Sequence, residues 1–133
     1  MTDLPVYYIN LASRPDRRDH MERQFRRLGV AAERIEAVTA SNVEQLVIEK
    51  EIPAEALHTL TAGQIACSLS HCLAWTKALE AGAQAVLILE DDALIAPALT
   101  KISREIIRTL RTGLIKLDTA SNMTVRLGSR TYD

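Results

Sequence analysis

The chain has 133 residues, of which 47% are hydrophobic and 25% charged, and this composition is typical of a globular protein with one modest core. The formal net charge of −1 comes from 16 basic and 17 acidic side chains, so a nucleic-acid binder that relies on bulk positive charge is excluded. The first ten residues lack the features of a secretory signal, and no stretch approaches the roughly 18 apolar residues of a membrane span.

The first predicted element is a strand at residues 5–11, where β-formers dominate. A helix is predicted to follow, with Ser13 as its cap, Pro15 in its first turn and Gly29 as its stop. Three apolar residues at helical spacing give this helix a buried face: Met21, Phe25 and Leu28.

A weaker strand is predicted at residues 34–38, and residues 41–60 indicate helical turns on either side of Pro53. Thr61 and Gln64 form a capping box, which predicts a helix that runs to about residue 80. We expect one stripe of this helix to be buried, and it consists of Ile65, Leu69, Cys72, Thr76 and Leu79.

Residues 85–89 are uninterruptedly apolar and predict a buried strand, followed by a helix near 97–112 and a strand at 114–117. Strands that alternate with helices indicate an α/β fold with a largely parallel sheet. We therefore predict one α/β domain over residues 1–118 and a polar tail of unclear structure over 119–133.

The two cysteines, Cys67 and Cys72, lie five positions apart on a predicted helix. At this spacing they occupy different sides of the helix and are poorly placed to pair with each other. We expect two buried, reduced thiols, which fit a cytoplasmic location.

Glu90, Asp91 and Asp92 directly follow the apolar strand at residues 85–89. Ligands of open α/β sheets bind beyond the carboxyl ends of the strands, and clustered carboxylates suit a hard cation such as Mg²⁺ or Mn²⁺. The alternative is a solvated turn in which Asp92 caps the following segment.

The turn between the first strand and the first helix carries Arg14, Arg17 and Arg18. A helix amino terminus attracts anions, and guanidinium groups suit phosphate. A solvated basic helix face is the alternative, because further arginines continue along the helix.

The predicted helix at residues 61–80 carries a polar stripe with spacings of three and four, made of Gln64, Cys67, Ser68, His71 and Trp75. His71 beside Trp75 can orient a ligand or can be a hydrogen-bonded core histidine. Ser68 and Ser70 lie in mid-helix, which argues against a nucleophilic triad.

Three of these segments together resemble glycosyltransferase family 25. Residues 6–17 resemble the family's INL-x-x-R-x-x-R start, and residues 63–71, with Trp75 beyond them, are similar to its G-C-x-x-S-H helix. Residues 86–92 resemble its apolar strand ending in E-D-D. The resemblance covers about residues 5–118 in matching order and spacing.

This resemblance implies a GT-A fold, a Rossmann-like sheet that binds UDP-galactose or UDP-glucose, and a lipopolysaccharide-core acceptor. It implies a divalent ion, Mn²⁺ or Mg²⁺, at the acidic motif Glu90, Asp91 and Asp92. It also places donor-binding residues in two segments, and they are Asn10, Leu11, Arg14 and Arg17 in the first, and Ser70 and His71 in the second.

Family members have about twice the length of one small domain, and this chain ends soon after residue 118. We therefore expect a fold truncated at its C-terminus, without an assignable catalytic base. One alternative is a non-catalytic remnant that binds a nucleotide sugar or self-associates through an unpaired sheet edge. Another is a phosphorylated receiver domain, because that fold also carries acids after a strand. Membrane contact, where present, is expected to be peripheral at the cytoplasmic face.

Overall fold

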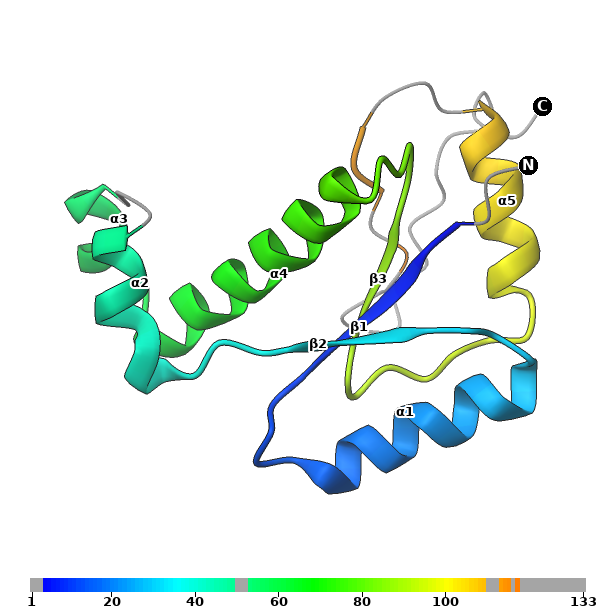
Figure 1. The fold of residues 1–133 in the computed structure, drawn as a ribbon, viewed down its shortest axis with the longest axis horizontal. Coiled ribbons are helices and arrows are strands. Elements are labelled where there is room, and N and C mark those ends of the chain that lie inside the picture. Colours follow the sequence, from blue (N-terminus) through cyan, green and yellow to red (C-terminus); the bar gives the residue numbers. More distant parts are fainter. Residues whose placement is uncertain (1–3, 50–52, 110–112, 116, 118–133) are drawn as a thin grey trace. The chain divides into compact units, whose positions relative to one another are not determined.

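The computed structural model describes residues 4–49, 53–109, 113–115 and 117. In this part of the chain a parallel sheet of three strands is covered by helices (Figure 1). The strands are β1 (Val6–Asn10), β2 (Glu33–Glu36) and β3 (Leu87–Glu90), and they lie in the order β2-β1-β3. The predicted α/β class is confirmed, and each strand begins and ends within two residues of its predicted limits.

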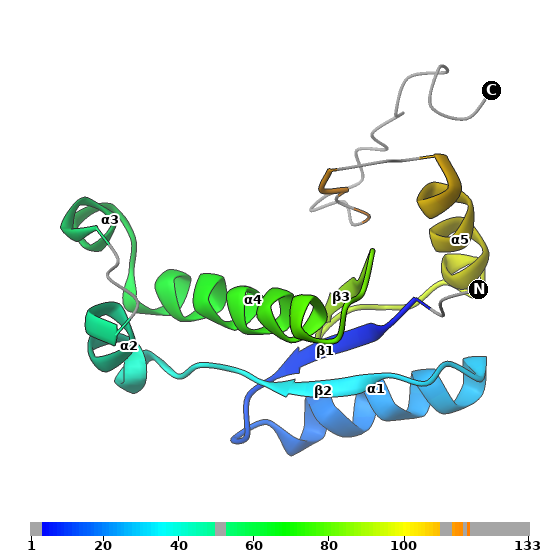
Figure 2. The same cartoon turned by 45° about the horizontal axis from the view of Figure 1, so that its top comes forward.

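The central strand β1 is buried along its whole length because helices cover both faces of the sheet. Figure 2 shows α1 (Pro15–Leu28) on one face and α4 (Ala62–Glu80) on the other. Tyr7 and Ile9 pack against alanines of α4, whereas the ring of Tyr8 lies 5.3 Å from that of Phe25 on α1. This alternation is the two-residue period expected of a strand.

Helix α1 ends as predicted at Gly29, whose positive φ of 64° allows the left-handed turn that closes the helix. Its predicted cap is wrong. The N-cap residue is Arg14, and no side chain caps this end. The reason is a turn in which the Arg14 backbone N–H donates to the Leu11 carbonyl, so that Pro15, which has no N–H to satisfy, occupies the first helical position.

Helix α4 begins with the predicted capping box, in which the side chains of Thr61 and Gln64 each accept from the other's backbone N–H. Its buried face differs from the prediction. Ile65 and Leu69 are buried, but the other three predicted positions, Cys72, Thr76 and Leu79, are exposed. The remaining buried residues are small, which lets the helix approach the sheet closely, and they are Ala66, Ser70, Ala74 and Ala78.

Both cysteines are free, as predicted, but both are exposed, so the expectation of buried thiols is wrong. The cause is the rotation of α4 about its axis. Because the helix turns its row of small residues toward the sheet, Cys67 and Cys72 lie on its outer sides.

The segment between β2 and α4 is helical on both sides of Pro53, as predicted. It contains a 3-10 helix η1 (Ala40–Asn42), α2 (Val43–Glu49) and α3 (Ala54–Thr59). Buried valines of this segment pack on the first turns of α4, in a cluster of Val38, Val43, Val47, Ile65, Ala66 and Leu69. The start of α4 is thereby fixed beside the end of β2.

The chain divides into two compact units at Pro97/Ala98. The second unit contains α5 (Leu99–Thr109), which confirms the predicted helix. The predicted strand at 114–117 is absent from its described residues, where Leu114 and Leu117 are 83% and 43% exposed and gain no burial that would favour pairing. Lys116 and the predicted tail at 119–133 lie outside the described residues. Among the helices that the structure describes, none combines the length and apolar character needed to cross a membrane.

Candidate functional site

The strand order places the carboxyl ends of β1 and β3 side by side. After β1 the chain crosses one face to reach β2, and later crosses the other face to reach β3 on the opposite side of β1. Such a reversal is the position where open α/β sheets bind ligands. The register pairs Ile9 with Glu90, so the residues that follow each of them, Asn10 and Asp91, meet at this edge.

Asn10 joins the two strand ends. Its side chain is 1% exposed, and its Nδ2 donates to Asp91 Oδ2 at 2.7 Å and to the Arg14 carbonyl at 3.1 Å. Its Oδ1 accepts from Arg34 Nε at 2.9 Å. The amide therefore connects both strands with the turn before α1, and every polar atom of this side chain has a partner.

Arg17 supplies the cation that faces the acidic segment. Its Nη1 lies 3.0 Å from Asp91 Oδ1 and 3.6 Å from Asp92 Oδ2. The Asp91 side chain is 11% exposed and accepts one hydrogen bond on each oxygen, from Asn10 and from Arg17, whereas the Asp92 side chain is 62% exposed. The structure thus brings together two of the three segments described in the sequence, residues 6–17 and 86–92. It leaves Asp92 as an accessible carboxylate.

Arg14 and Leu11 also lie in the turn before α1. Arg14 forms a bidentate ion pair with Asp16, in which Nε donates to Oδ1 at 2.9 Å and Nη2 donates to Oδ2 at 2.7 Å. The hydrogen bond from Arg14 is the main cause that lowers the pKa of Asp16 to about 2. Leu11 contributes its backbone carbonyl, which accepts from the Arg14 N–H. Arg14 is therefore partly neutralised, while Arg17 is directed toward the acids.

Ser70 is 1% exposed and holds α4 against the end of β2. Its Oγ accepts from the Val38 N–H at 2.9 Å and donates to the Ala66 carbonyl at 2.7 Å. Both contacts are internal to the fold. The geometry of Ser70 is thus that of a positioning residue.

His71 and Glu90 meet between α4 and the end of β3. His71 Nε2 lies 3.3 Å from Glu90 Oε1, and Cys67 Sγ donates to the same oxygen at 3.8 Å. Partial burial, and next the charge of Glu90, raise the pKa of the Cys67 thiol. The four-residue spacing of Cys67 and His71 placed both on one helix face, but nothing in the sequence indicated that Glu90 lies beside them.

The three acids do not converge on one point. Glu90 faces Cys67 and His71, whereas Asp91 and Asp92 face Arg17. Within the described ranges, the side chains whose ligand atoms gather within 4.8 Å of one another are those of Cys67, His71 and Glu90.

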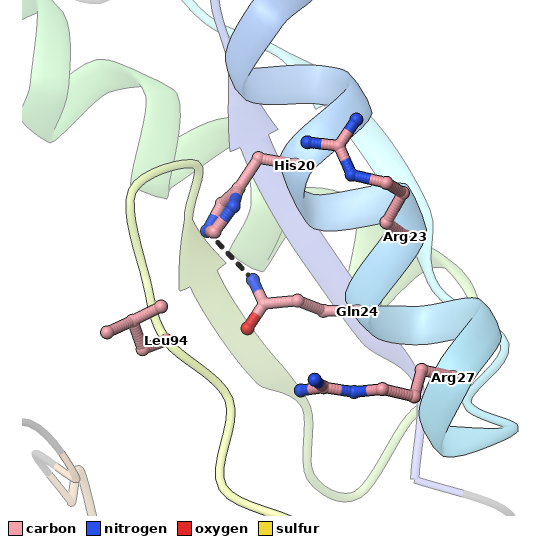
Figure 3. A pocket seen from close by; sticks show the side chains of 5 residues that line it. All are labelled: His20, Arg23, Gln24, Arg27 and Leu94. Carbon is pink, nitrogen blue, oxygen red and sulfur yellow. Dashed lines mark hydrogen bonds between the residues drawn. The ribbon is translucent and has the colours of Figure 1, made fainter.

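A hollow of about 390 Å³ lies beside the loop that follows the acidic segment (Figure 3). Its lining consists of His20, Arg23, Gln24, Arg27 and Leu94. Gln24 ties α1 to this loop, because its amide donates to the Ala93 carbonyl at 2.9 Å and accepts from the Ile95 N–H at 2.8 Å. Nothing in the spacing of these residues indicated this contact beforehand.

A sequence model described as "Glycosyltransferase family 25 (LPS biosynthesis protein)" matches residues 3–127. The lipooligosaccharide biosynthesis protein lic2B of Haemophilus influenzae is 34% identical over 100 residues, which cover 74% of this chain and 37% of that protein. The lacto-N-neotetraose biosynthesis glycosyltransferase LgtB of Neisseria meningitidis serogroup B is 29% identical over 100 residues, which cover 74% of this chain and 36% of that protein.

The inactive glycosyltransferase 25 family member 3 of Mus musculus is 30% identical over 96 residues, which cover 65% of this chain and 16% of that protein. The chain thus spans between 16% and 37% of the length of these three relatives. The match leaves the receiver-domain alternative without support.

Proposed function

The chain belongs to glycosyltransferase family 25, and from this premise we propose that it is the nucleotide-sugar-binding part of a hexosyltransferase. The donor is UDP-galactose or UDP-glucose, and the acceptor is a lipopolysaccharide-core sugar. The names of the two bacterial relatives support an oligosaccharide acceptor of this class.

The observation that carries the proposal is the network of Asn10, Asp91 and Arg17 at the carboxyl ends of β1 and β3. Two segments that resemble family motifs, 81 residues apart, are joined there by a hydrogen bond in which Asn10 is 1% exposed. A buried donor that loses its acceptor destabilises the fold, so a buried hydrogen bond favours the one geometry in which both partners meet. The hydrogen bond between Asn10 and Asp91 therefore fixes the two strand ends relative to each other.

The charges beside this network suit a diphosphate. The amino terminus of α1 presents backbone N–H groups and the positive end of the helix dipole. Arg14 and Arg17 lie at this end with side chains 41% and 39% exposed. Charge develops on the diphosphate as the sugar departs, and fixed guanidinium groups lower the free energy of that state.

A hard divalent ion fits the accessible part of the acidic segment. Mg²⁺ is commonly held by one or two carboxylates together with substrate phosphates and water, so convergence of three acids is not required. Asp92, with its side chain 62% exposed, is the carboxylate that is available for this role, while Asp91 is held by Asn10 and Arg17. When bound, Mn²⁺ or Mg²⁺ would neutralise charge on the leaving diphosphate.

The test is calorimetric titration of UDP-galactose and UDP-glucose into the full chain, with and without Mn²⁺. We expect metal-dependent binding that Asp92→Ala weakens at least tenfold, which corresponds to about 1.4 kcal/mol. Glu44→Ala is the matched control, because Glu44 is an exposed acid on α2, which contributes no residue to the network of Asn10, Asp91 and Arg17. Equal affinity of the Asp92→Ala and Glu44→Ala variants would contradict the proposed donor site.

A non-catalytic member that binds the donor without transfer is the second candidate. The relative named as inactive, at 30% identity, favours keeping it. Turnover of UDP-sugar in the presence of lipopolysaccharide-core oligosaccharide separates the two. Sugar transfer supports the enzyme, and tight donor binding without transfer supports the non-catalytic member.

A further inference from the structure

We propose that Cys67, His71 and Glu90 form a binding site for a borderline-soft divalent transition-metal ion, with Zn²⁺ as the best fit. The site is distinct in chemistry from a hard-ion site at Asp92. It does not rest on the proposed transferase function, because it follows from the donor atoms alone.

The fold brings the three side chains together through two rigid elements. Cys67 and His71 are one helical turn apart on α4, so both project from the same side of that helix. Glu90 is the last residue of β3. The next residue, Asp91, is held by Asn10 and Arg17, and this anchors the strand end from which Glu90 reaches α4.

The distances agree with a tetrahedral ion. Usual zinc bond lengths and tetrahedral angles put a nitrogen and an oxygen ligand about 3.3 Å apart, and a sulfur and an oxygen ligand about 3.6 Å apart. The observed separations are 3.3 Å for His71 Nε2 to Glu90 Oε1 and 3.8 Å for Cys67 Sγ to Glu90 Oε1. All three ligand atoms lie within 4.8 Å of one another, so one ion can reach the three side chains.

The ligand types decide which ion is preferred. A thiolate and an imidazole favour Zn²⁺ over Mg²⁺ or Mn²⁺, which prefer oxygen ligands. Binding replaces the Cys67 S–H by a sulfur–metal bond, and the thiol proton passes to the buffer. Three protein ligands leave the fourth position of a tetrahedral ion for water or another ligand, as in zinc sites that hold water or substrate there.

Accessibility is sufficient for an ion to enter. The side chains of His71 and Glu90 are 28% and 58% exposed, and Cys67 is also exposed. An ordinary ion pair at this place would need only His71 and Glu90. The thiol at the same carboxylate oxygen supplies the third ligand atom that a metal site needs.

The experiment uses Co²⁺ as a spectroscopic substitute for Zn²⁺ on the full chain, after reduction and removal of metals. We expect one equivalent of Co²⁺ to produce a thiolate-to-cobalt charge-transfer band together with the visible absorption of a tetrahedral ion. Zn²⁺ should abolish both signals at stoichiometric concentration, whereas Mg²⁺ in hundredfold excess should not.

Matched variants identify the ligands. Cys67→Ser should lose the charge-transfer band, and Cys72→Ser, which removes the other exposed thiol of the same helix, should retain it. His71→Ala and Glu90→Gln should each weaken Co²⁺ binding at least tenfold, while His58→Ala on α3 should have no effect. Far-ultraviolet circular dichroism establishes that each variant is folded.

Two results would overturn the proposal: a wild-type chain without the charge-transfer band, or a band that persists in Cys67→Ser and disappears in Cys72→Ser. A second measurement covers variants of reduced stability. Zn²⁺ should raise the Tm of the wild type and of Cys72→Ser, since an ion that binds only the folded state stabilises it, and should not raise that of Cys67→Ser. Equal shifts in all three proteins would also refute the site.

Discussion

Replacing Asp91 by alanine should destabilise the fold far more than the same change at Asp92. The side chain of Asp91 is 11% exposed and accepts from Asn10 at 2.7 Å and from Arg17 at 3.0 Å. Without the carboxylate, one N–H of the buried Asn10 amide loses its partner, at about 1–3 kcal/mol. The partly exposed pair with Arg17 adds up to about 1 kcal/mol. We therefore expect a loss of about 1–4 kcal/mol in the free energy of unfolding.

The assay is urea unfolding of the full chain, followed by circular dichroism and by the fluorescence of Trp75, the one tryptophan in the sequence. Asp92→Ala should change the free energy of unfolding by no more than about 0.5 kcal/mol, because its side chain is 62% exposed. Asp91→Asn keeps an oxygen acceptor for Asn10 and should fall between the two. Equal free energies of unfolding for Asp91→Ala and Asp92→Ala would refute the stabilising role of the hydrogen bond between Asn10 and Asp91.

Two further substitutions and one chemical modification experiment test other parts of the structure. Ser70→Ala should cost about 1–3 kcal/mol in urea unfolding, because the buried Val38 N–H loses its acceptor. Thr61→Ala removes one half of the capping box and should lower the free energy of unfolding by about 1 kcal/mol, with a parallel loss of Tm. In metal-free protein at pH 8, iodoacetamide should modify Cys67 more slowly than Cys72, because partial burial and the adjacent carboxylate raise the pKa of Cys67 and reduce its thiolate fraction. Mass spectrometry of tryptic peptides measures the two rates, and faster modification of Cys67 would contradict this explanation.

The sequence predicted the elements well because local signals mark them. The capping box of Thr61 and Gln64 and the stop at Gly29 both depend on chemistry within a few residues. The apolar run before Glu90 likewise indicated a buried strand. Parallel pairing followed from the alternation of such strands with helices.

The buried face of α4 was harder to predict, because helical spacing is compatible with more than one rotation of the helix about its axis. The expected positions Cys72 and Leu79 are exposed, whereas Ala74 and Ala78 are buried against the sheet. A helix that packs closely on a sheet needs small side chains, and no local pattern distinguishes such an alanine from one on the surface. The rotation of α4 about its axis can therefore be assigned only from its packing against the sheet.

Part of the candidate site could be predicted, and part could not. The acids at the end of β3 and the arginines at the start of α1 were recognisable from their places at strand and helix ends. The contact between Asn10 and Asp91 joins residues 81 positions apart and depends on the register of β1 with β3. Neighbouring side chains at a strand end point to opposite faces of the sheet, so Glu90 meets Cys67 while Asp91 meets Asn10, and the predicted acidic cluster is divided into two groups.

The position of β1 at the centre of the sheet also bears on the order in which the protein folds. Ile9 pairs with Ile35 across 26 residues, but with Glu90 across 81 residues. Closing the longer loop costs about 1 kcal/mol more in chain entropy, and contacts of long sequence separation slow folding. We expect β1, α1 and β2 to assemble first during synthesis, and β3 to dock afterwards. The strand ends that bring Asn10 to Asp91 then meet late, so slow or incomplete folding would leave a chain with native-like secondary structure in which the candidate site is not assembled.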